Sequence, residues 1–82
     1  MTDAELTDLE SVFRYCARVP DGVAVAGIAR GSWSEWDSMA HVSLIGALES
    51  QFDLQFALEE ALAITDWTTC VASVSAKLAA RG

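Results

Sequence analysis

The sequence predicts an all-α domain, a small four-helix bundle with a long loop after the first helix. Apolar residues recur at helical spacing in four separate stretches of the 82-residue chain. The first two stretches are separated by residues 19–36, which are rich in Gly, Ala and Ser and show no period. Residues 23–28 contain some β-branched side chains, but Gly and Ala dilute them too far for a strand. A chain of this length has room for one domain with one core, so residues 1–82 are expected to form a single domain.

The first helix is expected to run from about Asp3 to Arg18. Thr2 and Glu5 have the spacing of a capping box at its start. The residues Pro20-Asp21-Gly22 end it, because proline lacks the backbone donor and turn-forming residues gather there. An apolar stripe repeats every three or four residues, at Leu6, Leu9, Phe13 and Cys16.

The connection over residues 19–36 is unusually long for a compact domain, and such loops are more often functional than accidental. We expect it to be ordered, because it contains large apolar side chains that can pack on the bundle: Val23, Val25, Ile28 and Trp33.

The second helix is expected to begin at Asp37 or Ser38 and to end near Phe52-Asp53. Its predicted core-facing row, flanked by Leu44, is Val42, Ile45, Leu48 and Phe52.

A short third helix is expected over Ala57 to Ile64, with Leu58, Ala61 and Leu62 facing inward. Asp66 can cap the last helix, whose apolar residues repeat at helical spacing at Trp67, Val71, Val74 and Leu78.

The charge of the chain excludes several classes of partner. The sequence has 12 Asp plus Glu against 5 Lys plus Arg, a net charge of -7. Nucleic acids and anionic membrane surfaces attract clusters of Lys and Arg, so neither is expected as a partner. No apolar run approaches the ~18 residues that span a bilayer, and the N-terminus does not resemble a signal peptide. We therefore expect a cytoplasmic monomer that is steered toward basic patches on other proteins.

The segment Asp37-Ser38-Met39, where the long loop enters the second helix, is the strongest candidate site. A serine at a helix N-terminus is accessible, and the free backbone donors and positive dipole end favour an anionic group there. Taken alone, however, Asp-Ser before an apolar run is more often a simple helix cap.

Over nearly its whole length the chain resembles the acyl carrier protein family. Asp37-Ser38-Met39 is similar to that family's Asp-Ser-Leu attachment motif, with Met replacing Leu at similar volume. The register continues downstream through the segment Leu44-Ile45-Gly46-Ala47-Leu48-Glu49, Phe52, Phe56, Glu59-Glu60-Ala61 and Ile64-Thr65.

The resemblance implies a four-helix bundle whose serine at the start of the second helix carries a covalent cofactor. A separate phosphopantetheinyl transferase would use coenzyme A and Mg²⁺ to attach 4'-phosphopantetheine to Ser38. Asp37 could help to position the metal-bound donor in that transferase. The thiol of the arm would then hold acyl groups as thioesters for acyl-loading, acyl-transferring or condensing enzymes, and the chain itself would not be an enzyme.

The chain departs from carriers of fatty acid synthesis, which have acidic residues where it has Ala40 and Ser43. Docking is therefore expected to depend less on charge and more on apolar contacts, and polyketide or other specialised acyl biosynthesis is favoured over fatty acid synthesis. The residues expected to contact partners are Met39, Val42, Glu49, Leu58, Glu59 and Glu60.

Two alternatives belong to other functional classes. One is an unmodified helical interaction module in which Asp37 and Ser38 only cap a helix. The other is a small thiol-dependent enzyme that uses Cys16 or Cys70, although both cysteines are more simply explained as small apolar residues of helical stripes. The cysteine spacing does not favour a metal site, and His41 is expected to be a solvated helix residue.

Overall fold

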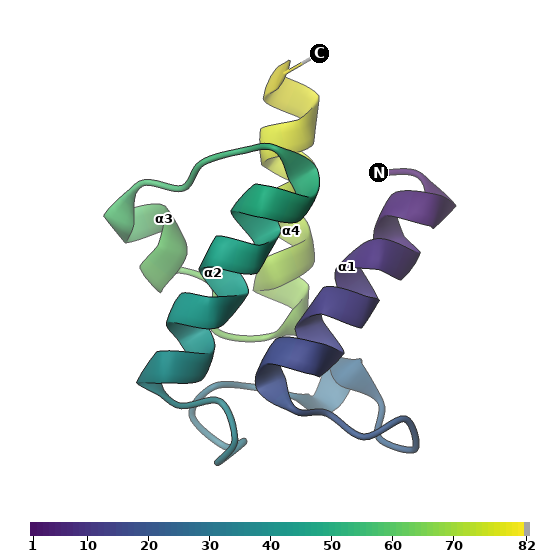
Figure 1. Cartoon of the computed structure of the whole chain (residues 1–82), viewed down its shortest axis with the longest axis vertical. Coiled ribbons are helices and arrows are strands. Elements are labelled where there is room, and N and C mark those ends of the chain that lie inside the picture. Colours follow the sequence, from purple (N-terminus) through teal and green to yellow (C-terminus); the bar gives the residue numbers. More distant parts are fainter. Residues whose placement is uncertain (82) are drawn as a thin grey trace.

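The computed structural model describes residues 1–81, which form four α-helices around one core (Figure 1). The predicted all-α class is confirmed, since the described residues contain no strand and only an isolated bridge between Ala29 and Asp66. The elements are α1 (Asp3–Ala17), the 3-10 helix η1 (Val25–Gly27), α2 (Ser38–Phe52), α3 (Leu58–Leu62) and α4 (Trp67–Arg81).

Helix α1 starts with the predicted capping box. Thr2 Oγ1 accepts a hydrogen bond from the Glu5 amide at 3.1 Å, and the Thr2 amide donates to Glu5 Oε1 at 2.8 Å. The helix ends at Ala17, one residue before the predicted end, because Arg18 adopts the left-handed conformation that closes helix C-termini.

The core lies between α1, α2 and α4, with the long loop closing one end. Phe13 of α1 is fully buried, and its ring lies edge-on to Trp36 at 5.3 Å and to Trp67 at 5.1 Å. Other buried side chains come from all three long helices: Leu9, Ala17, Leu44, Leu48, Phe52, Cys70 and Val74.

The long loop packs apolar side chains on the bundle, as predicted, and polar contacts that were not predicted also hold it. Val25 and Ile28 are buried, and Trp36 is only 2% exposed. Trp33 is half-buried, and its indole N–H donates to the Ala17 carbonyl at 2.7 Å, at the C-terminus of α1. The amide of Arg30 donates to the Thr65 carbonyl at 2.7 Å, which ties the loop to the segment before α4.

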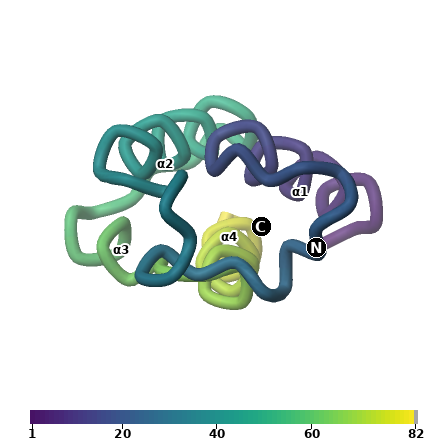
Figure 2. The backbone as a smooth tube through the Cα atoms, turned by 90° about the horizontal axis from the view of Figure 1, so that it is seen from below, coloured from purple at the N-terminus to yellow at the C-terminus, as the bar shows by residue number. Residues whose placement is uncertain are grey.

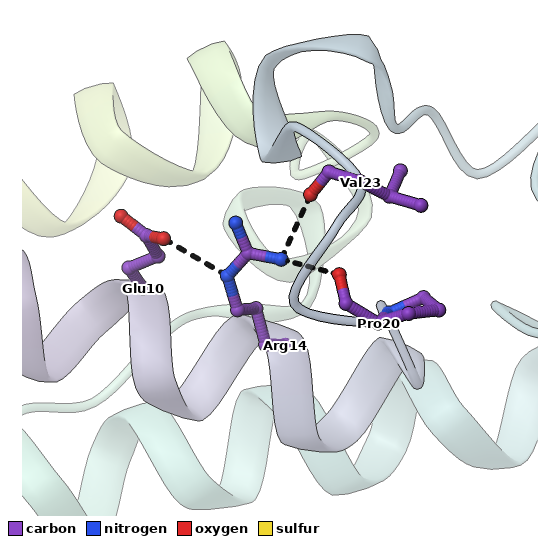
Figure 3. A network of polar contacts seen from close by, with 4 residues as sticks. All are labelled: Glu10, Arg14, Pro20 and Val23. Atoms are coloured by element: carbon purple, nitrogen blue, oxygen red, sulfur yellow. Dashed lines mark hydrogen bonds and ion pairs between the residues drawn. The ribbon is translucent and has the colours of Figure 1, made fainter.

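Arg14 fixes the first turn of this loop (Figure 3). Its guanidinium donates to the carbonyls of Pro20 and Val23, both at 2.8 Å, and to the carboxylate of Glu10 at 2.9 Å. One half-buried side chain of α1 thus satisfies two backbone carbonyls in a segment that forms no helix.

The predicted core-facing row of α2 is correct at Leu48 and Phe52 but wrong at Val42 and Ile45. The buried residues are His41, Leu44, Leu48 and Phe52, whereas Val42 is 72% exposed and Ile45 is only half-buried. Helix α2 is apolar around much of its circumference, so the spacing of its apolar residues leaves the core-facing side ambiguous.

The third helix is shorter than predicted, and its expected orientation is also wrong. It covers Leu58–Leu62 rather than Ala57 to Ile64, and none of its five residues is buried. Leu58 and Leu62 are 74% and 55% exposed, while Ile64, just after the helix, is fully buried. In this segment the chain is anchored by Ile64, which leaves the apolar side chains of α3 facing solvent.

Helix α4 begins as predicted, with Asp66 at its N-terminus. Asp66 Oδ1 accepts hydrogen bonds from the amide and the hydroxyl of Thr69, both at 2.8 Å. Seen from below in Figure 2, α3 lies beside α2, and the long loop runs across the end of the bundle where α4 starts. Within residues 1–81, no helix has both the length and the apolar character needed to cross a membrane.

Candidate functional site

The start of α2 lies at the end of the bundle remote from both chain termini (Figure 1). The end of α1, the long loop and the beginning of α4 are near it, whereas the start of α1 and the end of α4 lie toward the opposite end. The loop ends at Trp36, the residue immediately before Asp37. Its indole is buried, which anchors the chain to the core just before α2 begins.

Asp37 and Ser38 have different roles in the local structure. Asp37 is the N-cap of α2, and its Oδ1 accepts a hydrogen bond from the Ala40 amide at 2.8 Å. Ser38 is the first helical residue and is exposed, and its hydroxyl has no hydrogen-bond partner among residues 1–81. The capping role is thus filled by Asp37, which leaves the Ser38 hydroxyl free for chemistry.

An open depression of about 510 Å³ lies between the end of α1 and the start of α2, and its lining includes Asp37 and Met39 on either side of Ser38 but not Ser38 itself. Its lining is mixed, with apolar, cationic and acidic side chains that include Cys16, Arg18, Glu35, Asp37 and Met39. Arg18 and Glu35 form a loose ion pair at 3.6 Å across it.

The three apolar residues predicted to contact partners are all strongly exposed. Met39 is 79%, Val42 72% and Leu58 74% exposed, and Leu62 adds a fourth apolar side chain that sequence reasoning had placed in the core. Met39 and Val42 are three residues apart on α2, and Leu58 and Leu62 are four apart on α3, so each pair shares one helix face. We call these four side chains the apolar surface.

The predicted acidic contact residues differ from one another in their surroundings. Glu59 is exposed. Glu49 accepts a hydrogen bond from the Phe56 amide at 2.9 Å, and Glu60 pairs with Lys77 of α4 at 2.7 Å. The hydrogen bond from Lys77 is the main cause that lowers the pKa of Glu60. Two of the three acids therefore hold the α2–α3–α4 segment together, which the sequence spacing did not indicate.

His41 was expected to be solvated, and this expectation is wrong. The side chain is 6% exposed. Trp36 Nε1 donates to His41 Nδ1 at 3.1 Å, and His41 Nε2 lies 2.9 Å from the Ala61 carbonyl oxygen. Burial lowers the pKa of the imidazole below its ordinary value. A clue was present in the sequence, because His41 precedes Leu44 and Leu48 at the spacing of one helix face.

The two cysteines do not have the surroundings of reactive thiols. Cys70 is fully buried, and burial raises its pKa to about 12. Cys16 is half-buried, and burial raises its pKa as well. A catalytic thiol is instead favoured by a lowered pKa and a basic neighbour. Across residues 1–81, no three His, Cys, Asp or Glu side chains come close enough together to hold a metal ion.

Comparison of the chain with protein-family models, with curated proteins and with solved structures gave no significant match.

Proposed function

We propose that this protein is a carrier domain that bears 4'-phosphopantetheine on Ser38. A phosphopantetheinyl transferase would join Ser38 Oγ to the pantetheine-side phosphorus of coenzyme A. The serine hydroxyl would lose its proton, the pyrophosphate bond of coenzyme A would break, and adenosine 3',5'-bisphosphate would leave. The thiol of the arm would then carry acyl groups as thioesters to acyl-loading, acyl-transferring or condensing enzymes. The departures from fatty-acid-type carriers at Ala40 and Ser43 favour polyketide or other specialised acyl biosynthesis.

The observation that carries this proposal is the free, exposed hydroxyl of Ser38 at the first position of α2. A phosphodiester at this position would lie at the positive end of a 15-residue helix, next to backbone N–H groups that lack intrahelical partners. Ser38 is exposed, so attachment would not require any buried side chain to move.

An unmodified interaction module is the second candidate, and the apolar surface supports it as well as it supports the carrier. Exposed apolar groups on α2 and α3 would serve a carrier and an interaction module equally well. The two candidates differ at Ser38. A module that used the Asp-Ser pair only as a cap would need the Asp37 carboxylate, which already fills that role, and would have no use for the serine hydroxyl.

Modification in vitro tests the proposal. Unmodified protein incubated with coenzyme A, Mg²⁺ and a broad-specificity transferase should gain one phosphopantetheine, as read by intact mass. Ser38→Ala should abolish the gain. Ser43→Ala is the matched control, because Ser43 is an exposed serine of the same helix, and this variant should be modified like the wild type.

A further variant distinguishes the N-capping role of the Asp37 side chain from the effect of its negative charge. Asp37→Asn keeps a good N-cap but removes the carboxylate, so it should melt like the wild type and be modified more slowly if the carboxylate helps the transferase. The proposal fails if several transferases leave the wild type unmodified, or if Ser38→Ala still gains the group.

A further inference from the structure

The two sides of α2 differ at the end where Ser38 lies. On the side that faces α3, the imidazole of His41 occupies the space between the two helices, since it is 6% exposed and its Nε2 lies 2.9 Å from the Ala61 carbonyl oxygen. On the side that faces the end of α1, the surface is hollowed by the depression of about 510 Å³. A flexible group attached to Ser38 therefore has an open depression beside it on the α1 side.

The depression begins next to the attachment residue. Asp37 and Met39, the two neighbours of Ser38, both line it, and consecutive Cα atoms are only about 3.8 Å apart. A group tethered to Ser38 would therefore be present at the depression at an effective concentration on the order of millimolar. At such a concentration, even weak contacts would hold a substantial fraction of the tethered group in place.

The polar side chains of the lining are available for contacts, while their backbone is held in place. Arg18 closes α1 and its amide is bonded to that helix, yet its guanidinium has only the loose ion pair with Glu35 at 3.6 Å. Both side chains are substantially exposed, so opening this pair costs little. Glu35 stands between two anchored tryptophans, Trp33, which bonds to the end of α1, and Trp36, which is buried.

The lining matches the chemistry of an uncharged chain of mixed character. Beyond its phosphate, 4'-phosphopantetheine consists of methyl and methylene groups, a hydroxyl, two amides and a terminal thiol. Cys16, Met39 and Ala40 of the lining offer apolar contacts to the hydrocarbon groups. The Arg18 guanidinium can donate to amide carbonyls, and the Glu35 carboxylate can accept from amide N–H groups. The volume also lies within the range of about 300–1,000 Å³ that is usual for small-molecule sites.

We propose that the depression between α1 and α2 is a binding site for the uncharged pantetheine part of the arm, while the phosphate stays at the N-terminus of α2. This inference rests on the proposed function. The carboxylates of Glu35 and Asp37 disfavour an anion inside the depression but do not repel a neutral chain. Because the arm then lies toward α1, the exposed side chains of Val42, Leu58 and Leu62 stay accessible to partner enzymes.

NMR of the protein before and after modification tests this inference. Intact mass first establishes that Ser38 carries the arm, so failure of the modification itself is recognised separately. In the modified protein, amide chemical shifts should change in residues 15–18 of α1, which are distant from Ser38 in the sequence. The methyl protons of the arm should show nuclear Overhauser contacts to the Tyr15 ring and to the Met39 methyl group, because both side chains line the depression.

Two variants that add bulk at adjacent positions of α2 form a matched pair. Ser43 is exposed and lines the depression, and helix side chains lean toward the N-terminus, so Ser43→Phe should cover the depression beside Ala40. Val42 is also exposed but does not line it, so Val42→Phe is the control. The contacts of the arm with α1 should be lost in Ser43→Phe and should persist in Val42→Phe.

Arg18→Met measures the polar contact, because methionine keeps an apolar stem but has no donors. Loss of one hydrogen bond should lower the ratio of docked to free arm by about fivefold. The shift changes of residues 15–17, each taken relative to the unmodified form of the same variant, report this ratio.

Three results would overturn the inference while leaving the modification of Ser38 intact. One is a modified wild type whose shift changes are confined to residues 36–40. Another is a set of contacts from the arm to Leu58 or Leu62 in place of Tyr15 and Met39. The third is an arm whose contacts are the same in Ser43→Phe as in the wild type. If the wild type is not modified at all, both this inference and the proposed function fail.

Discussion

The long loop and helix α3 reverse the usual relation between regular structure and burial. Residues 19–36 contain only a single 3-10 turn, yet this loop buries four apolar side chains: Val19, Val25, Ile28 and Trp36. Helix α3 is regular, yet it buries none of its residues. Helical hydrogen bonds satisfy a segment's own backbone, but its attachment to the domain depends on the side chains that it buries. The loop is therefore part of the core, and α3 is a cover held by polar ties.

The largest expected difference between the two regions is in the stability lost when one apolar side chain is truncated in each. Ile28→Ala removes a side chain that is 3% exposed in the loop and should cost about 2–5 kcal/mol of the free energy of unfolding. Leu58→Ala removes a similar side chain that is 74% exposed on α3 and should change stability by less than about 0.5 kcal/mol. Urea unfolding followed by circular dichroism measures both. Equal losses would show that α3 is as firmly packed as the loop.

Removing a polar contact should also cost more stability in the long loop than in α3. Arg14→Met removes the donor of two loop carbonyls and should cost about 2 kcal/mol, since hydrogen bonds from charged groups to backbone are stronger than neutral ones. Lys77→Met frees Glu60 of α3 and should cost much less, because the Glu60 carboxylate remains in water.

The same unfolding experiment measures both polar variants. Hydrogen exchange adds local information, since Arg14→Met should deprotect amides of residues 19–28 and Lys77→Met those of residues 58–62. A larger loss of stability from Lys77→Met would mean that the ion pair, rather than the packing of the loop, dominates the fold.

Much of the fold follows from local sequence signals. The capping residues Thr2 and Asp66 were predicted correctly, and the cap of α2 was narrowed to Asp37 or Ser38, because a cap is formed between residues only a few positions apart. The helical stretches were recognised for the same reason. The exposed hydroxyl of Ser38 was also expected from its position at the start of α2.

Apart from the ends of α1 and α3, the errors concern which helix face is turned toward the core. Val42 and His41 are adjacent in α2, and only contacts with the distant residue Ala61 and with Trp36 decide that His41 is the buried one. Leu58 and Leu62 have the spacing of a core stripe, but Ile64 takes the buried position in this segment. The spacing of His41 with Leu44 and Leu48 offered a clue, but Val42 and Ile45 have an equally regular helical spacing, so the pattern alone does not choose between the two faces.

The smallest effect, and the one that connects the comparison to function, concerns docking by α3. If α3 is a cover that displays apolar groups, Leu58→Ala should leave stability unchanged but weaken recognition by the transferase that we propose for Ser38. Loss of one apolar contact of about 1.4 kcal/mol corresponds to about a tenfold lower kcat/KM. Met39→Ala, on the α2 part of the apolar surface, should have an effect of similar size.

A variant that removes an exposed charge is the matched control for this prediction. Glu59→Gln alters an exposed acid next to Leu58 and should lower kcat/KM by no more than about twofold at physiological salt, where exposed charges are screened beyond about 8 Å. Glu49→Gln would be a poorer probe, because Glu49 binds the Phe56 amide and its loss would also disturb the connection between α2 and α3. A salt series on the wild type should therefore give a shallow decline. A steep decline, together with a larger defect from Glu59→Gln than from Leu58→Ala, would show that the acidic face governs docking and that the exposed leucines of α3 are incidental.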